Sequence, residues 1–495
     1  MSANQTPKAT ALDLVAATDV EAAKAVVENL FDSQLETLKA LVRIPGIAWD
    51  AFDANNLETS AKAVCQLFES TGLFESVEIL RAEKSGASEA HGEELAAEPT
   101  PAAMGAPAVV AHRQARNGAP QVLLYAHHDV QPQGDESLWL TSPFEPVVVA
   151  DSVNGDRMYG RGAADDKAGI IAHHTALLAL RGILGDDFDL GITLFVEGEE
   201  EAGSPSFRNF LEKYQQKLEA DVIVVADSSN FSTTIPAITT TLRGLVSQVF
   251  EVRTLDHALH SGMYGGVVPD AMLAMVKVLA SLHDEVGHVA IAGLHQGHAS
   301  DLPYSEAELR TDSGLLPNTE LIGTGSILDR IWARPALTII GIDVPSVATS
   351  SNTMQPAVRA KVSMRLAPGQ EPGSALEALR AHLETNLPFG AQITYGDIEM
   401  GSPFAAETGE WGHALMSSAL SHAYGTESVD IGIGGSIPFI ADLKEVFENA
   451  QILVTGVEDP DSRAHSPNES VHLPTLKAAM TAETLFLLGA NALRK

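Results

Sequence analysis

The sequence predicts an α/β protein of two domains, in which the larger domain has a central mixed, mostly parallel sheet flanked by helices. One observation is that short apolar runs, typical of strands, alternate with longer runs of helical periodicity, which indicates a sheet with helices on its faces. These runs are Gln121–Tyr125, Ile170–Leu180, Gly191–Val196, Phe207–Leu218 and Val222–Ala226. The second observation is the length of 495 residues, which exceeds one ordinary hydrophobic core and indicates two domains.

A separate domain is predicted between residues 243 and 396. Its strands and helices follow one another in the order βαββαβ, which predicts a ferredoxin-like α+β domain. They are the strand Leu245–Val252, the helix Ala271–Leu282, the strands Ala336–Ile342 and Val358–Leu366, the helix Ala375–Leu387 and the strand Ala391–Tyr395. We expect this domain to be an insertion, so that residues 1–242 and 397–495 together form the larger domain.

The segment before residue 121 contains two predicted helices and one predicted strand. They are the helices Val20–Val42 and Ser60–Ser70 and the strand Val77–Arg81. Residues 83–118 are rich in Ala, Glu, Pro and Gly and show almost no periodicity. Much of this stretch is therefore expected to be a surface insertion, with a short strand near Ala108–Ala111.

The composition excludes several classes of function. The chain has 31 basic and 65 acidic residues, and this formal net charge of −34 argues against binding to nucleic acid or an anionic membrane surface. A single cysteine, Cys65, excludes an intrachain disulfide framework and a cysteine-based zinc motif. The first residues lack a basic stretch followed by an apolar core, and no apolar run has the length of a membrane span. We therefore expect a cytoplasmic protein.

Two adjacent carboxylates, Asp165 and Asp166, lie in the glycine-rich stretch Tyr159–Gly169, just before the apolar run Ile170–Leu180. Carboxylates at this position cap a helix and interact favourably with the positive end of its dipole. Capping is therefore one interpretation of the pair. The other is a metal site with Asp165 at its centre, because four other stretches of the chain each offer a potential metal ligand.

Three of these stretches follow predicted strands, and in α/β sheets ligands gather beyond the carboxyl ends of the strands. They contain His127 with Asp129, the acidic run Glu199–Glu201, and Asp227. His127 and Asp129 share a face if the extended geometry continues, and such a carboxylate can orient a metal-binding histidine. The fourth stretch contains His465. Taken singly, such residues are more often strand-end, turn or solvated loop residues.

Taken together, the stretches resemble the M20 metallopeptidases, and most of all the carnosinase-like dipeptidases of that family. The segments that carry the resemblance are Tyr125–Pro132, Gly160–Lys167, Glu200–Ser204, Asp227 and Ala464–Ser466. They occur in order over most of the chain, and residues 83–118 lie outside them.

The resemblance implies a centre with two metal ions. Asp165 would bridge the two ions. His127 and Asp227 would complete the ligands of one ion. Glu201 and His465 would complete those of the other, and the peptide bond that follows the bridging aspartate is expected to be cis. Two histidines and three carboxylates without a thiolate suit zinc, and would also accept manganese or cobalt.

The family pattern assigns Glu200 as the general base and Asp129 as the partner of His127. The acidic run could also be framed one residue earlier, but the glycine and serine that follow it favour this frame. Two ions about 3.5–4 Å apart can hold a bridging water and lower its pKa. Glu200 would take the proton of this water and deliver it to the leaving amine. The predicted reaction is hydrolysis of the amide bond of a dipeptide or short peptide with a free C-terminal carboxylate.

The inserted domain resembles the lid of the same family, which also forms a homodimer interface. His260 resembles the lid histidine that reaches the active site of a neighbouring subunit, where it would stabilise an oxyanion. Arg365 and Ser436 resemble the residues that receive the C-terminal carboxylate of a substrate, and arginine suits a bidentate contact with it. A loop histidine and a surface arginine are the alternative interpretations. The stretch Ile431–Ile433 departs from the charged segment of carnosinases, which leaves the substrate side chain open.

Two other functions are compatible with parts of this pattern. An M20 acylase or carboxypeptidase, acting on N-acyl amino acids, would use the same metals with a different substrate pocket. A non-catalytic peptide-binding relative would lack a ligand or the base, and no such position is missing. Dinucleotide binding is excluded, because the glycines around Arg161 lack a third glycine at the required offset.

Overall fold

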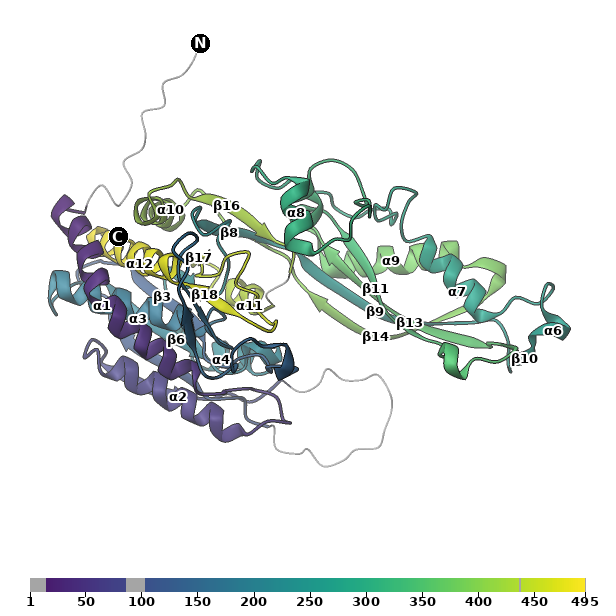
Figure 1. Ribbon diagram of the computed structural model, residues 1–495, viewed down its shortest axis with the longest axis horizontal. Coiled ribbons are helices and arrows are strands. Elements are labelled where there is room, and N and C mark those ends of the chain that lie inside the picture. The colour runs from purple at the N-terminus through teal and green to yellow at the C-terminus, as the bar shows by residue number, and fades with distance from the viewer. Residues whose placement is uncertain (1–14, 86–102, 436–437, 495) are drawn as a thin grey trace, which may run out of the picture. The chain divides into compact units, whose positions relative to one another are not determined.

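The computed structural model describes residues 15–85, 103–435 and 438–494 (Figure 1). The chain divides into two compact units. The first contains the chain up to Thr240, together with Ala406–Asp430 and the part from Asp442 onward. The second contains Thr241–Ala405 and Ile431–Ala441. The first unit is therefore discontinuous in sequence.

The first unit is built from helices and short strands. Its helices are α1 (Ala17–Val42), α2 (Ala54–Glu69), α3 (Lys167–Leu184), α4 (Phe207–Lys213), α5 (Gln215–Leu218), α10 (Trp411–Tyr424), α11 (Pro438–Val446) and α12 (Leu473–Ala492). Its strands are β1 (Ser76–Leu80), β2 (Ala108–Arg113), β3 (Gln121–His127), β4 (Val147–Val149), β5 (Arg157–Tyr159), β6 (Gly191–Glu197), β7 (Val222–Val225), β8 (Ala237–Leu242), β16 (Val429–Ile433), β17 (Gln451–Val454) and β18 (Ser470–His472). Of these elements, β8, β16 and α11 extend across the boundaries between the units.

The main sheet has parallel strands at its centre. Its order is β1-β2-β6-β3-β7-β17-β8-β15, with β16 paired to β8 and with β15 formed by Phe404–Ala405. The neighbours β6, β3, β7 and β17 are parallel, whereas β1, β2 and β8 run antiparallel to the strands beside them. The predicted mixed sheet is confirmed, although its parallel pairing is confined to the centre.

Helices cover both faces of this sheet, so that β3 and β6 are buried along their whole length. On one face, α12 packs against α1, α3 and α10, and together they enclose the main hydrophobic core. On the other face, the ring of Phe195 in β6 stacks on Phe210 of α4, with ring centroids 4.9 Å apart. The predicted flanking helices are therefore confirmed.

The second unit has a four-stranded antiparallel sheet in the order β11-β13-β9-β14. Its elements are β9 (Gly244–Arg253), β10 (Leu259–His260), α6 (Ser261–Tyr264), α7 (Ala271–Ala280), α8 (Glu306–Ser313), β11 (Ala336–Asp343), β12 (Thr353–Met354), β13 (Ala357–Leu366), α9 (Pro372–Asn386) and β14 (Gln392–Gly401). Helices α7 and α9 lie on one face of the sheet (Figure 1), and their buried apolar residues belong to one cluster with those of β9, β11 and β13. This connectivity confirms the predicted ferredoxin-like fold.

The short strand expected near Ala108–Ala111 is confirmed as β2, which is buried between β1 and β6. Residues 86–102 of the expected surface insertion lie outside the described residues. Two other sequence-based expectations differ from the structure. The helix expected at Phe207–Leu218 is broken at Tyr214, whose backbone leaves the helical region (φ −111°, ψ 19°). Residues 397–405 and Ile431–Ala441 group with the second unit. Strand β14 continues beside β9 as far as Gly401, and Arg243 donates its backbone N–H to the carbonyl of Ile433.

Candidate metal centre

The carboxyl ends of three parallel strands hold three of the five candidate ligands of the first unit. His127 is the last residue of β3, Glu201 belongs to the short 3₁₀ turn that follows β6, and Asp227 follows β7. These strands are neighbours in the order β6-β3-β7, so their carboxyl ends lie at one edge of the sheet. Asp165 precedes α3, and His465 lies in the loop between β17 and β18.

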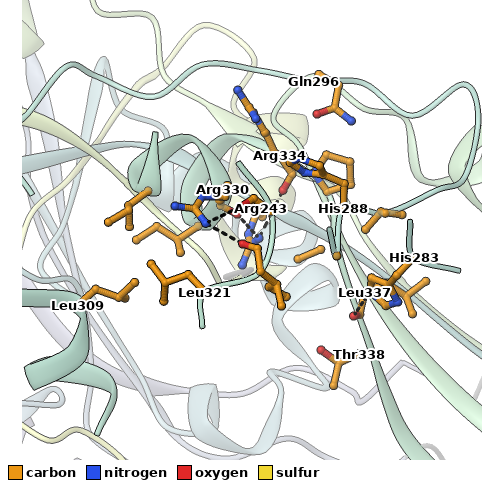
Figure 2. Close-up of a pocket in the computed structure, with 18 residues that line it drawn as sticks. Arg243, His283, His288, Gln296, Leu309, Leu321, Arg330, Arg334, Leu337 and Thr338 are labelled. Carbon is orange, nitrogen blue, oxygen red and sulfur yellow. Dashed lines mark hydrogen bonds between the residues drawn. The ribbon is translucent and has the colours of Figure 1, made fainter. Parts of the chain in front are cut away.

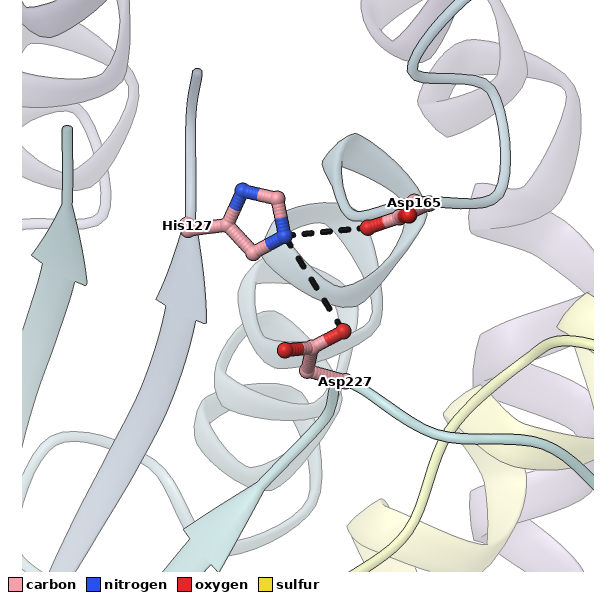
Figure 3. Close-up of side chains that lie close together, drawn as sticks. All are labelled: His127, Asp165 and Asp227. Carbon is pink, nitrogen blue, oxygen red and sulfur yellow. Dashed lines mark hydrogen bonds and ion pairs between the residues drawn. The ribbon is translucent and has the colours of Figure 1, made fainter. Parts of the chain in front are cut away.

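Asp165 lies between two histidines. Its Oδ1 is 3.0 Å from Nε2 of His127, and its Oδ2 is 3.0 Å from Nε2 of His465. Nε2 of His127 is also 3.9 Å from Oδ1 of Asp227 (Figure 3), and Nε2 of His465 is 3.1 Å from Oε2 of Glu201. In each group of three residues, the ligand atoms lie within 4.8 Å of one another. The structure thus brings the five predicted ligands together, with Asp165 common to both groups.

Asp129 connects His127 to the acidic turn. Its Oδ1 lies 3.3 Å from Nδ1 of His127, the ring nitrogen that faces away from the cluster. Its two carboxylate oxygens accept hydrogen bonds from the backbone N–H groups of Glu200 and Glu201, each at 3.1 Å. A carboxylate in this position fixes the orientation of a metal-binding imidazole. The neighbouring His128 points away from the cluster, as predicted, and its Nε2 donates to the carbonyl of Pro107 at 2.8 Å.

The three glutamates of the acidic turn have different surroundings. The carboxylate of Glu199 accepts hydrogen bonds from the backbone N–H groups of Ala106 and Ser206, both at 2.8 Å, and so fastens the turn to the protein. Glu201 lies against His465 in the cluster. Burial and the charge of Asp227 raise the pKa of Glu200 well above its ordinary value. Glu201 thus lies in the cluster and Glu199 outside it, while the role of Glu200 stays a prediction.

The loop that carries His465 has an unusual backbone. Arg463, His465 and Asn468 all have positive φ angles, of 56°, 62° and 66°, in the left-handed region that residues other than glycine rarely adopt. The side chain of Asn468 secures the loop, because its Oδ1 accepts from the N–H of Leu140 at 2.7 Å and its Nδ2 donates to the carbonyl of Leu138 at 3.0 Å. Such conformations are common where a side chain must be aimed at a functional site.

Glu469 holds the loop that carries Asp165, a role that the sequence analysis missed. Its Oε1 accepts hydrogen bonds from the N–H groups of Ala164 at 3.0 Å and Asp165 at 3.1 Å. Its Oε2 accepts from the N–H of Gly162 at 3.1 Å and from Nη1 of Arg161 at 2.6 Å. Both partners of this ion pair are buried. In the sequence, the only indication of this role is that Glu469 is an acidic residue in the segment Ala464–Glu469, which also contains His465.

The peptide bond between Asp165 and Asp166 is cis, as predicted. Asp166 precedes α3 but makes no side-chain capping hydrogen bond. Its Oδ2 instead accepts a hydrogen bond from the backbone N–H of His127 at 3.1 Å. The capping interpretation of this carboxylate pair is therefore wrong for Asp166.

The pKa values at the centre reflect the crowding of carboxylates. Burial raises the pKa of Asp227 to about 7, and burial together with the charges of Asp165 and Asp227 raises the pKa of Glu458. The sequence analysis did not select Glu458, which follows β17, the strand beside β7. Hydrogen bonds to Asp165 and Glu201 raise the pKa of His465 to about 11. Clustered carboxylates with perturbed pKa values are typical of functional sites.

The residues present fit a pair of divalent cations. Among the described residues, no lysine or arginine forms an ion pair with Asp165, Glu201 or Asp227, so the cluster has an excess of negative charge that cations would balance. The two oxygens of Asp165 face different groups, which is the arrangement of a bridging carboxylate. Imidazole nitrogens and carboxylate oxygens are suitable ligands for zinc and manganese.

The remaining predicted site residues belong to the second unit or to undescribed positions. His260 is exposed at the start of α6, and its Nδ1 accepts a hydrogen bond from the N–H of Gly262 at 3.0 Å. Arg365 lies in β13 between Leu245 of β9 and Ala336 of β11. Ser436 lies outside the described residues. The roles assigned to these three residues stay predictions.

The fold and the cluster together form a candidate binuclear metal site at the carboxyl edge of an α/β sheet. The profile of peptidase family M20/M25/M40 matches residues 123–488. The chain belongs to this family and is a metallopeptidase.

Two curated proteins similar to this chain are dipeptidases. The cysteinylglycine-S-conjugate dipeptidase of Corynebacterium striatum is 33% identical over 375 residues, which is 75% of this chain and 81% of the relative. The Beta-Ala-His dipeptidase of Homo sapiens is 29% identical over 369 residues, 71% of either chain. Among solved structures, the di-peptidase Dug1p of Saccharomyces cerevisiae matches with a TM-score of 0.74 at 22% identity. The match covers 96% of this chain and 99% of Dug1p. Human carnosine dipeptidase 1 has a TM-score of 0.70 at 24% identity over 96% of this chain and 99% of that one.

No described helix is both long enough and apolar enough to cross a membrane.

Proposed function

We propose that this metallopeptidase hydrolyses dipeptides or short peptides that have a free C-terminal carboxylate. The observation that carries the proposal is the position of Asp165, with each of its oxygens 3.0 Å from a different histidine. His127 and Asp227 would hold one divalent ion, and Glu201 and His465 the other. The names of the dipeptidase relatives support a dipeptide as substrate.

Glu200 is the proposed general base. Bound divalent ions supply Lewis-acid polarisation of the scissile carbonyl and lower the pKa of the attacking water. Glu200 accepts a proton from that water and passes it to the nitrogen of the leaving amine, a transfer that typically contributes a factor of about 10²–10⁴ to the rate. The backbone N–H of Glu200 donates to Asp129, which also contacts His127, so one carboxylate positions both the base and a ligand.

Zinc is the proposed metal, since two histidines and three carboxylates without a thiolate suit it, although manganese and cobalt would bind the same ligands. The test is elemental analysis of the purified protein combined with peptidase assays before and after chelation. We expect about two divalent ions per chain and loss of hydrolysis on chelation. Full activity in protein that contains no divalent metal would contradict the proposal.

A substrate panel separates the proposed dipeptidase from an acylase or carboxypeptidase of the same family. It contains Cys-Gly, β-Ala-His, longer peptides and N-acetyl amino acids. We expect the free dipeptides to have the highest kcat/KM. Preference for N-acetyl amino acids would support the acylase instead, and absence of hydrolysis with both metals bound would support a peptide-binding relative.

The second unit is the proposed lid and dimerisation domain, with Arg365 and Ser436 receiving the substrate carboxylate and His260 stabilising an oxyanion. Strand β11 supports a homodimer, because it is an edge strand whose Ile340 is 54% exposed. An apolar edge strand is a liability unless another chain covers it, and a twofold dimer is the commonest way to do so. Light scattering of wild-type protein and of an Ile340→Lys variant tests this assignment.

The expected cytoplasmic location stays a prediction that cell fractionation would test.

A further inference from the structure

A cavity of about 500 Å³ lies within the second unit, apart from any residue assigned to the metal centre (Figure 2). Its walls are the start of β11, helix α8, and the irregular chain between α7 and β11, including the π-helical turn Asp329–Ala333. This volume is in the range of small-molecule binding sites. Most of the lining residues belong to the chain between α7 and β11, which is additional to the βαββαβ elements of the ferredoxin-like core.

The lining is cationic in a strongly acidic protein. It includes three arginines and two histidines but no aspartate or glutamate. The cationic and imidazole side chains are Arg243, Arg330, Arg334, His283 and His288. The whole chain has 65 acidic against 31 basic residues, so a cavity lined only by basic and neutral groups runs against its composition. Such a site attracts anions.

Backbone carbonyls hold two of the arginines in place. Nε of Arg243 donates to the carbonyl of Gly434 at 2.9 Å, and Nη1 of Arg330 donates to the carbonyl of Ile322 at 2.6 Å. Within the described parts of the chain, neither arginine forms an ion pair with a carboxylate, whereas Arg334 pairs with Asp329. Burial and the charge of Arg365 lower the pKa of Arg243 to about 10, which indicates a cation without a compensating anion.

The same cavity has an apolar side. Figure 2 shows Arg243 and Arg330 near the middle, with Leu309 and Leu321 on one side and Leu337 beyond them on the other. Pockets that combine a mostly apolar wall with a few fixed polar groups bind ligands that have both characters. Fixed guanidinium groups are suited to carboxylate and phosphate oxygens.

We propose that this cavity binds a small organic anion, with its carboxylate or phosphate at Arg243 and Arg330 and its apolar body along Leu309 and Leu321. None of the residues that line the cavity is one of the five predicted metal ligands, so we expect ligand binding here not to depend on the metals. Carboxylate and phosphate share the same recognition chemistry, so the two ligand classes are distinguished by experiment.

The test is isothermal titration calorimetry of the metal-loaded protein with phenyl phosphate and 4-phenylbutyrate. Benzyl alcohol is the probe that has only the apolar body, and inorganic phosphate is the probe that has only the anion. We expect saturable binding of at least one aryl anion at one site per chain, tighter than either partial probe. The aryl anion with the lower Kd identifies the ligand class.

Variants locate the binding. Arg330→Gln removes one cation, and Leu309→Trp fills the apolar side without changing the charge. We expect each to weaken binding by about 10–100-fold, the effect of losing a charge-assisted hydrogen bond or a comparable part of the pocket. Arg359→Gln is the matched control, because this arginine of the same unit is exposed and pairs with Asp343 outside the cavity. Asp165→Asn, which alters the metal centre, should leave the affinity unchanged.

The proposal would be overturned if no aryl anion bound the wild-type protein, or if inorganic phosphate bound as tightly as phenyl phosphate. It would also be overturned if Leu309→Trp and Arg330→Gln both kept wild-type affinity. Loss of binding in Asp165→Asn alone would assign the anion to the metal centre instead. Circular dichroism of each variant verifies that the second unit remains folded.

Discussion

Replacing Glu469 with glutamine should destabilise the first unit and weaken metal binding. The wild-type carboxylate accepts four hydrogen bonds, three from backbone N–H groups and one from Arg161. Burial raises the pKa of Glu469, and Arg161 opposes this shift, but four donors around one carboxyl group require its ionised form. Glutamine places an NH₂ group against two of these donors and leaves the buried Arg161 without a counter-charge.

The expected magnitude follows from burial. Removing one partner of a buried ion pair costs about 3–5 kcal/mol of unfolding free energy, because the other charge is left uncompensated. Arg161 is only 1% exposed, so water cannot replace the lost carboxylate. Since the same carboxylate fixes the N–H of Asp165, we also expect metal affinity to fall by about 10–100-fold, as for other residues that orient ligands.

The assay combines chemical denaturation with metal titration against a competing chelator. Glu483→Gln is the matched control, because Glu483 is also buried and pairs with a cationic partner, His173, at 2.7 Å without contacting a ligand loop. We expect both variants to lower the stability, but only Glu469→Gln to weaken metal binding. Equal metal affinity in the two variants would refute the positioning role of Glu469.

Three further predictions test the site and the assembly. The Glu200→Gln variant should keep its metals and have a kcat lower by at least about 10²–10⁴-fold, whereas the Asp165→Ala variant should lose metal. Loss of metal in Glu200→Gln would contradict the assignment of Glu200 as the base. Burial lowers the pKa of His173, but Glu483 more than offsets this and raises it overall, so the stability that the pair contributes is full below about pH 6.5 and declines as the pH rises through the raised pKa. Denaturation of wild type and Glu483→Gln across this pH range measures that decline, and a constant difference would count against it. If His260 acts on the neighbouring subunit, mixing His260→Ala with Glu200→Gln protein should partly restore activity after subunit exchange, and verified mixed dimers without activity would exclude this.

The sequence alone determined which segments form strands and helices and which residues could be ligands. Apolar periodicity is a local property, so β3, β6, β7 and α3 could be predicted from residues close together in the chain. The positions of His127 and Asp227 at strand ends then follow, because parallel strands present their carboxyl ends at one edge of the sheet. The assignment of Asp165 and His465 to the same cluster came from the resemblance to the M20 metallopeptidases.

Only the tertiary structure decided which polar groups face one another. Glu469 contacts the loop before Asp165 across 304 residues of sequence, and Asp129 reaches the N–H groups of Glu200 and Glu201 across 71 and 72 residues. No local pattern encodes such contacts, because they depend on the path of the intervening chain. The burial of β2 has the same origin, since a short strand inside a weakly periodic stretch becomes part of the core only when β1 and β6 flank it. The cationic cavity of the second unit also arises this way, from arginines far apart in sequence that one fold brings to a common space.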